Sequence, residues 1–228
     1  GTIAAGDYLK KISRNCRIVA SEALQCPTLI WCGFGDHRIE GIGDKHVPWI
    51  HNVRNTDAVV AIDDESCVRL LRTFNEPKGQ QALIDAGIPK KLTESLPLLG
   101  FSSISNLISA VKTAKFFEMN EDDILFTSLT DSAEMYSSRL EELRQERGKY
   151  DSTQGLVDWE RYLLGEGIQN MMELTYHDRK RLHNFKYFTW VEQQGKTFEE
   201  INELWDPEFW DEAYSQVDHW DKLIEEFN

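Results

Sequence analysis

The stretch DAVVAIDDESCVRLLRTF, residues 57–74, decides the fold. Its first part is a run of small and β-branched apolar residues that ends in acids, which predicts a buried strand at residues 57–63. Asp63 and Asp64 are suited to cap a helix, because carboxylate oxygens accept hydrogen bonds from the unpaired N–H groups of a first turn. Apolar side chains then follow at helical spacing: Cys67, Leu70, Leu71 and Phe74. A buried strand that runs directly into a helix is the repeating unit of an α/β fold.

The same pattern recurs on both sides of this stretch. CRIVA (residues 16–20) predicts a second buried strand, and DILFTSLTDS (residues 123–132) predicts a third. Helices are expected from the opening residues, from 102–119 with Ser102 or Ser103 as the cap, and from 133–146. We therefore predict an α/β fold with a mostly parallel sheet and flanking helices, whose ligands lie beyond the carboxyl ends of the strands.

Two segments interrupt the alternation. Residues 32–52 contain four glycines and are too long for an ordinary connection, so this loop is expected to be functional or mobile. Residues 75–100 contain Pro77, Pro89 and Pro97, which predict two short helices with a bend between them.

From residue 148 onward the composition changes. The segment is helical in period, acidic and rich in aromatic residues, and it carries five of the seven tryptophans: Trp159, Trp190, Trp205, Trp210 and Trp220. Rings of this size favour burial over a solvated tail. We predict an α/β domain at residues 1–147 and, at residues 148–228, a helical extension that packs on that domain or on a partner subunit.

The overall composition excludes several classes of protein. A formal net charge of -14 disfavours nucleic acid and anionic membranes as partners. The sequence has neither a membrane-length apolar stretch nor a signal-peptide pattern, so we expect a cytoplasmic protein. The four cysteines form no CxxC pair, and the histidines of the long loop lack completing ligands, which favours free thiols and no metal site.

Six segments in this order resemble the second half of the cysteine synthase and cystathionine β-synthase family of fold-type-II pyridoxal-phosphate enzymes. They are GTIAAGDYLK, RIVASE, HRIEGIGDKHVPWI, AVVAIDDES, GFSSISN and LTDSAEMY, and they span roughly residues 1–143. The resemblance implies pyridoxal 5'-phosphate as the cofactor. Ile104, where the family usually has a glycine after the two serines, is a departure that affects the substrate cavity.

The resemblance also assigns site residues. Gly1 and Thr2 match the end of a glycine-rich loop that binds the cofactor phosphate, Ser132 matches the serine that hydrogen-bonds the pyridine nitrogen, and Gly41 and Gly43 match a loop at the mouth of the substrate site. Each pattern also has an ordinary structural reading. A Gly-Thr pair before a helix is a common turn, a serine before a helix is a common cap, and a glycine in a loop usually marks a turn.

The expected function is part of a pyridoxal-phosphate lyase or synthase that catalyses β-elimination or β-replacement on an amino acid. The Schiff-base lysine that such chemistry requires is expected upstream, in an N-terminal half of a longer or two-part protein, because the family's Ser-x-Lys context is missing here. The chain alone is expected to be inactive, and the complete enzyme to be a homodimer. The alternative is a non-catalytic α/β remnant or a partner module of the same fold.

Overall fold

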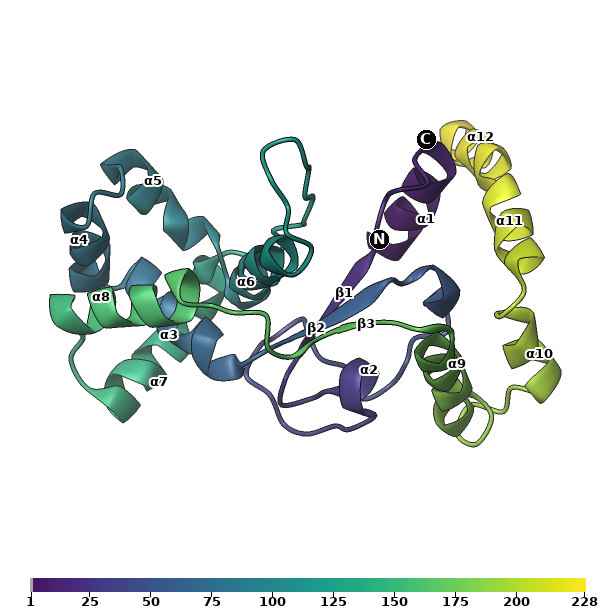
Figure 1. Cartoon of the computed structure of the whole chain (residues 1–228), viewed down its shortest axis with the longest axis horizontal. Coiled ribbons are helices and arrows are strands. Elements are labelled where there is room, and N and C mark those ends of the chain that lie inside the picture. Colours follow the sequence, from purple (N-terminus) through teal and green to yellow (C-terminus); the bar gives the residue numbers. More distant parts are fainter. Residues whose placement is uncertain (1) are drawn as a thin grey trace. The chain divides into compact units, whose positions relative to one another are not determined.

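The computed structural model describes residues 2–228, which form two compact units (Figure 1). The larger unit comprises Val19–Lys45 and Ala58–Glu173, and the smaller comprises residues 2–18, His46–Asp57 and Leu174–Asn228. Each unit is therefore built from segments that are distant in the sequence. The expected domain boundary between residues 147 and 148 does not coincide with a division between these units.

A small mixed sheet lies in the larger unit. Its order is β1 (Val19–Ala23), β2 (Ala58–Ile62) and β3 (Met171–Glu173). β1 and β2 are parallel, whereas β3 runs antiparallel to β2. All five residues of β2 are buried, as its continuous apolar run predicts. The expectation of a mostly parallel sheet is thus correct for the first pair and wrong for the third strand.

The third strand is also in a different place from the predicted one. Residues 123–132 form neither a helix nor a strand, and they join no sheet among the described residues. β3 instead comes from the segment that composition marks as helical, and it pairs with β2 through a ladder extended by the hydrogen bond from Ala61 N to Asn170 O at 2.9 Å. Three residues are too few to show a strand period, so the sequence pattern does not reveal this strand.

The larger unit also contains most of the helices that α/β folds place beside a sheet. In the larger unit these are α2 (Thr28–Trp31), α3 (Asp64–Asn75), α4 (Pro77–Asp85), α5 (Lys90–Ser95), α6 (Phe101–Phe116), α7 (Ser137–Arg147) and α8 (Ser152–Trp159). Asp63 caps α3 by accepting from Glu65 N at 2.9 Å, as predicted. Pro77 begins α4 and Pro89 precedes α5, so the two short helices are confirmed. The core lies between the sheet and the inner faces of α3 and α6, where Leu70, Phe74 and Ile104 are buried.

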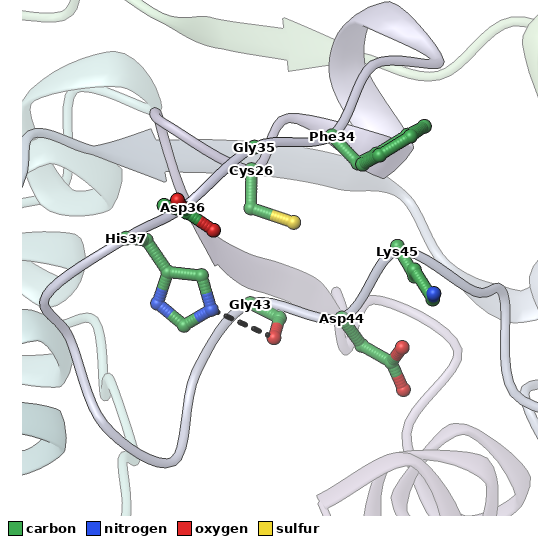
Figure 2. A pocket seen from close by; sticks show the side chains of 8 residues that line it. All are labelled: Cys26, Phe34, Gly35, Asp36, His37, Gly43, Asp44 and Lys45. Atoms are coloured by element: carbon green, nitrogen blue, oxygen red, sulfur yellow. Dashed lines mark hydrogen bonds between the residues drawn. The ribbon is translucent and has the colours of Figure 1, made fainter.

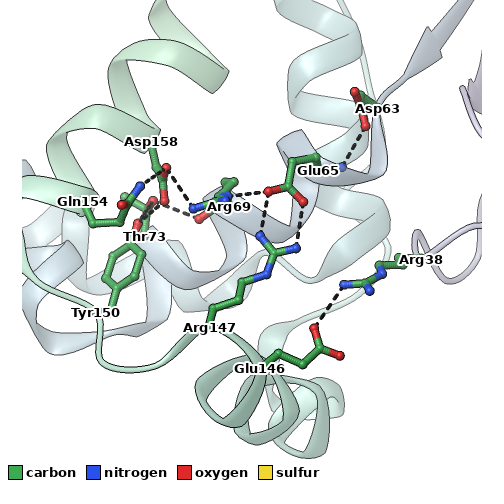
Figure 3. Close-up of polar contacts among 10 residues, drawn as sticks. All are labelled: Arg38, Asp63, Glu65, Arg69, Thr73, Glu146, Arg147, Tyr150, Gln154 and Asp158. Atoms are coloured by element: carbon green, nitrogen blue, oxygen red, sulfur yellow. Dashed lines mark hydrogen bonds and ion pairs between the residues drawn. The ribbon is translucent and has the colours of Figure 1, made fainter.

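The segment after α7 returns to α3 through polar contacts (Figure 3). Both guanidinium NH groups of Arg147 donate to Glu65, at 2.6 and 2.8 Å, and this pair holds the pKa of the Glu65 carboxyl at about 2 despite partial burial. Tyr150 Oη lies 2.8 Å from Thr73 Oγ1 and donates to Asp158 on α8, also at 2.8 Å. Residues 148–159 are therefore held against α3 and belong to the larger unit.

The smaller unit is helical. Its helices are α1 (Thr2–Ile12), α9 (Tyr176–Trp190), α10 (Phe198–Glu203), α11 (Pro207–Ser215) and α12 (Val217–Phe227). Trp190 packs edge-on against Trp49 with the ring centroids 5.5 Å apart, and its indole N–H donates to Val47 O at 2.9 Å. Trp220 on α12, by contrast, is 47% exposed. The tail is thus helical as predicted, but its tryptophans are not all buried.

Candidate cofactor and substrate site

Ser132 directly precedes a short 3-10 helix, Ala133–Tyr136. Its backbone is extended and its carbonyl accepts from Met135 N at 3.2 Å. Its side chain makes no capping hydrogen bond to this helix. Ser132 is therefore the N-cap residue by position, but its half-buried hydroxyl does not cap the helix.

Asp131, the residue before Ser132, is fixed by several donors in the larger unit. Its carboxylate accepts from the backbone N–H groups of Ser102 and Ser103 at 3.0 and 2.8 Å, and from Tyr136 Oη at 2.8 Å. Burial alone would raise the pKa of this carboxyl, but the hydrogen bonds from Ser103, Tyr136 and the two backbone groups hold it below its usual value. Burial and the same carboxylate raise the pKa of Tyr136.

This arrangement corrects the predicted cap of α6. Neither Ser102 nor Ser103 precedes the helix, because Gly100 is the N-cap residue and α6 begins at Phe101. The carboxylate of Asp131 satisfies the N–H groups of the first turn from 28 and 29 residues away. The sequence contains no local signal for such a cap, since capping patterns are recognised by short spacing.

Gly41 reaches the same helix start from the long loop. Its φ of 86° lies in the left-handed region that glycine adopts without strain. A Cβ added there would lie 3.6 Å from Ser102 Cβ, so the loop backbone packs closely on Ser102. Ser102 Oγ in turn lies 2.9 Å from Thr130 Oγ1. The structure therefore brings Gly41 and the segment before Ser132 to one place, the N-terminus of α6.

Gly43 lies in the same loop and lines a pocket of about 540 Å³ (Figure 2). Its φ is 109°, and its carbonyl oxygen is 3.1 Å from His37 Nε2. The other lining residues are Cys26, Phe34, Gly35, Asp36, His37, Asp44 and Lys45. A Cβ on Gly43 would come within 2.7 Å of His37 Nε2, so glycine is required for this closure of the loop.

The loop that carries both glycines is tethered at Asp64, the first residue of α3. The carboxylate of Asp64 accepts from Arg38 N, and burial raises its pKa although this hydrogen bond opposes the effect. Sequence reasoning assigned Asp64 only to helix capping and did not select Cys26 or His37. A buried carboxylate that binds a loop far away in the sequence leaves no local motif from which it is predicted.

The predicted phosphate-loop residues belong to the smaller unit. Gly1 lies outside the described residues. Thr2 is the first residue of α1, an 11-residue helix, and so stands at the end where helix N–H groups are unpaired. Ser132, Gly41 and Gly43 all belong to the larger unit.

Two lysines of the chain are buried, and both are engaged. Lys112 Nζ lies 3.2 Å from Glu166 Oε2 in a pair whose side chains are 3% and 9% exposed. Lys186 Nζ donates to Trp49 O and His51 O, each at 2.8 Å, and burial lowers its pKa to about 7. Lys45 lines the pocket but is exposed, so it lacks the burial that activates a catalytic lysine.

Within residues 2–228, no group of three or more side chains is arranged to hold a metal ion. None of the helices in that range is both long and apolar enough to cross a membrane.

The chain was also compared with known proteins. The chain is 31% identical, over 139 residues, to cysteine synthase B of Campylobacter jejuni subsp. jejuni. The match covers 60% of the chain and 40% of that protein, so the chain spans well under half the length of this relative. No family model and no solved structure matches the chain. The similarity supports a cysteine synthase-like family.

Proposed function

We propose that the chain is the non-lysine part of a pyridoxal-phosphate enzyme that performs β-elimination or β-replacement on an amino acid. The observation that carries this proposal is the free hydroxyl of Ser132 beside the anchored carboxylate of Asp131, in a chain similar to cysteine synthase B. The complete enzyme is proposed to be a homodimer, with its lysine in another part of the protein.

The residues fit the cofactor at the point where its ring nitrogen is recognised. When bound, pyridoxal phosphate supplies an electron sink for chemistry at the α and β carbons of an amino acid. Ser132 is suited to donate a hydrogen bond to a neutral pyridine nitrogen, whereas a carboxylate there would keep the nitrogen protonated. Asp131 does not take that role, because its oxygens already accept from Ser102, Ser103 and Tyr136.

The other residues shape the surroundings. Gly41 allows the loop backbone to approach the start of α6, and the closure between Gly43 and His37 forms one wall of the pocket. These contacts support a role for the loop in holding an amino-acid substrate.

The alternative is a non-catalytic α/β remnant or partner module of the same fold. Borohydride reduction in the presence of pyridoxal phosphate, followed by peptide mapping, separates the two. In the complete protein we expect label on a lysine outside these 228 residues. Label on Lys45 or any other lysine of this chain would overturn the proposal that the Schiff-base lysine lies in another part of the protein. No label at all would favour the non-catalytic module.

The role of Ser132 is tested in the complete protein with Ser132→Ala and Ser132→Asp. Both are expected to lower the β-elimination rate while circular dichroism stays unchanged. Ser138→Ala, an exposed serine of α7, is the matched control and should keep the wild-type rate. Wild-type rates in both Ser132 variants would remove the assignment.

A further inference from the structure

The last helix of the chain, α12, has an apolar side that residues 2–228 leave largely exposed. Val217, Trp220, Ile224 and Phe227 follow one another at spacings of three and four residues, which places them on one side of the helix. No residue of α12 is buried, and Phe227 is 91% exposed. In a soluble protein a helix with one apolar side lays that side against another surface. The apolar side of α12 therefore indicates a docking surface.

An acidic stripe runs along α12 beside this apolar side. Asp218, Asp221 and Glu225 are spaced at i, i+3 and i+7, so they share one side of the helix. Among residues 2–228, no lysine or arginine forms an ion pair with these three carboxylates, whereas Asp211 on α11 pairs with Lys11 at 2.9 Å. A partner that covers the apolar side also approaches the acidic stripe. Such a partner is expected to combine apolar area with positive charge.

The smaller unit carries a surface of this kind, the cationic patch, which consists of Arg54, Tyr176, Lys180 and Trp205. Lys180 Nζ lies 4.3 Å from the centroid of the Trp205 ring, and Arg54 Cζ lies 5.3 Å from it. Tyr176 packs edge-on against Trp205 with the ring centroids 5.9 Å apart, and Tyr176 is 62% exposed. The patch therefore places two cations beside two aromatic rings at the surface.

The two cations of the patch have no acidic partner in the described chain. Arg54 donates one N–H to Trp205 O at 2.8 Å. Among residues 2–228, no carboxylate forms an ion pair with Arg54 or Lys180, whereas Arg179, the neighbour of Lys180 in the sequence, pairs with Asp57 at 3.3 Å. Burial lowers the pKa of Lys180, and the charge of Arg54 lowers it further. A carboxylate from outside would relieve this repulsion between like charges.

We propose that α12 of one copy of the chain docks on the cationic patch of a second copy. The apolar side of α12 covers the rings of Tyr176 and Trp205, and the acidic stripe faces Arg54 and Lys180. Figure 1 shows α9, which carries Lys180, apart from α12, with α10 and α11 between them, so the helix does not lie on the patch of its own copy. The contact uses no residue of the candidate site, so it goes beyond the proposed function and stands without it.

Two such contacts close a dimer. Each copy presents one helix and one patch, so a two-fold axis lets both helices dock at once. The second contact then forms within an existing complex, which strengthens the pairing. Tyr176, Lys180, Trp205 and α12 lie after residue 143, beyond the segments that resemble a known family. The contact is therefore a property of the helical tail of this chain.

Sedimentation velocity of the 228-residue chain tests the contact, with a dimer expected at micromolar concentrations. The patch-reversed variant is Arg54→Glu/Lys180→Glu, and the helix-reversed variant is Asp221→Lys/Glu225→Lys. Each variant places like charges in both contacts of its dimer, so each should dimerise about tenfold or more weakly than the wild type. Circular dichroism checks the folding of each variant. If a double substitution unfolds the chain, the single variants Lys180→Glu and Glu225→Lys carry the same test.

An equimolar mixture of the two reversed variants gives the decisive measurement. In the mixed dimer the glutamates of one patch face the lysines of one helix, and the other contact has the wild-type charges. The mixture should therefore dimerise to within about threefold of the wild type. Lys91→Glu and Glu121→Lys, at exposed positions of the larger unit, are the matched controls and should leave dimerisation unchanged.

Three results would overturn the proposed contact. The first is a wild-type chain that stays monomeric, and the second is a pair of reversed variants that dimerise as strongly as the controls. The third is a mixture of folded reversed variants that stays monomeric, because the two surfaces then do not meet each other.

Discussion

Replacing Asp131 by alanine is expected to destabilise the larger unit far more than the loss of an ordinary helix cap. The carboxylate accepts from Ser102 N, Ser103 N and Tyr136 Oη, so three donors lose their acceptor at once. Loss of a capping side chain costs about 1 kcal/mol. A hydrogen bond to a charged group contributes about 1.5–3 kcal/mol. Together we expect a loss of about 3 kcal/mol in the free energy of unfolding.

Asp151 provides the matched control, because it is an aspartate cap in the same unit. It begins α8 and accepts from Gln154 N at 2.8 Å. Asp151→Ala should therefore cost about 1 kcal/mol. Urea unfolding at pH 7, followed by circular dichroism at 222 nm, measures both variants in the transition of the larger unit.

The pH dependence gives a second check on Asp131. Its pKa is lowered in the folded state, so its contribution to stability is present above the unfolded value of about 3.9 and is lost as the pH falls through the folded value. The difference between wild type and Asp131→Ala should therefore shrink only below about pH 4. If Asp131→Ala costs no more than Asp151→Ala at pH 7, the carboxylate does not organise the start of α6 and the argument for Ser132 loses its anchor.

Three further perturbations test the buried ionisable groups. Burial lowers the pKa of His51 to about 4, so on acidification the unfolded state binds the proton first. The free energy of unfolding should therefore decrease as the pH is lowered from about 6.5 to about 4, by up to about 3 kcal/mol. In a series of urea unfolding curves at different pH values, His51→Asn should remove most of this decrease. The pKa of Lys186 is lowered to about 7, so between about pH 7 and 10 the unfolded state binds more protons and stability should rise with pH. Thermal melts measure this rise, and a Lys186→Met variant that still shows it would refute the prediction. Lys112→Met should lower the free energy of unfolding by about 3–5 kcal/mol, because it leaves the buried Glu166 carboxylate without its cation. Calorimetry should show that the double variant Lys112→Met/Glu166→Leu regains most of this stability. Additive effects of the two substitutions would show that the pair is not coupled.

Patterns that repeat locally allowed much of the fold to be predicted. The apolar run before Asp63 and the helical spacing after it determine β2 and α3, and proline positions determine α4 and α5. These elements follow from neighbours within a few residues. The cap of α6 by Asp131 and the ladder between β2 and β3 join residues that are far apart, so no local spacing reports them.

The candidate site was predictable to a similar extent. The resemblance to a known family pointed to Ser132, Gly41 and Gly43, and the structure places Gly41 and the segment before Ser132 at one helix start. The interaction of His37 with Gly43 and the three donors to Asp131 depend on tertiary packing. Residues 123–132 are predicted as a strand from the sequence, yet they join no sheet among the described residues.

The interleaving of the two units determines how the protein is best divided in the laboratory. The chain passes between them at residues 18/19, 45/46, 57/58 and 173/174, so no single cut releases either one. A truncation after residue 147, which composition alone would recommend, removes β3 from the sheet and deprives buried Lys112 of its carboxylate partner Glu166. Shortened versions designed from the tryptophan-rich tail would therefore report on a damaged sheet, whereas single-residue variants leave both units whole.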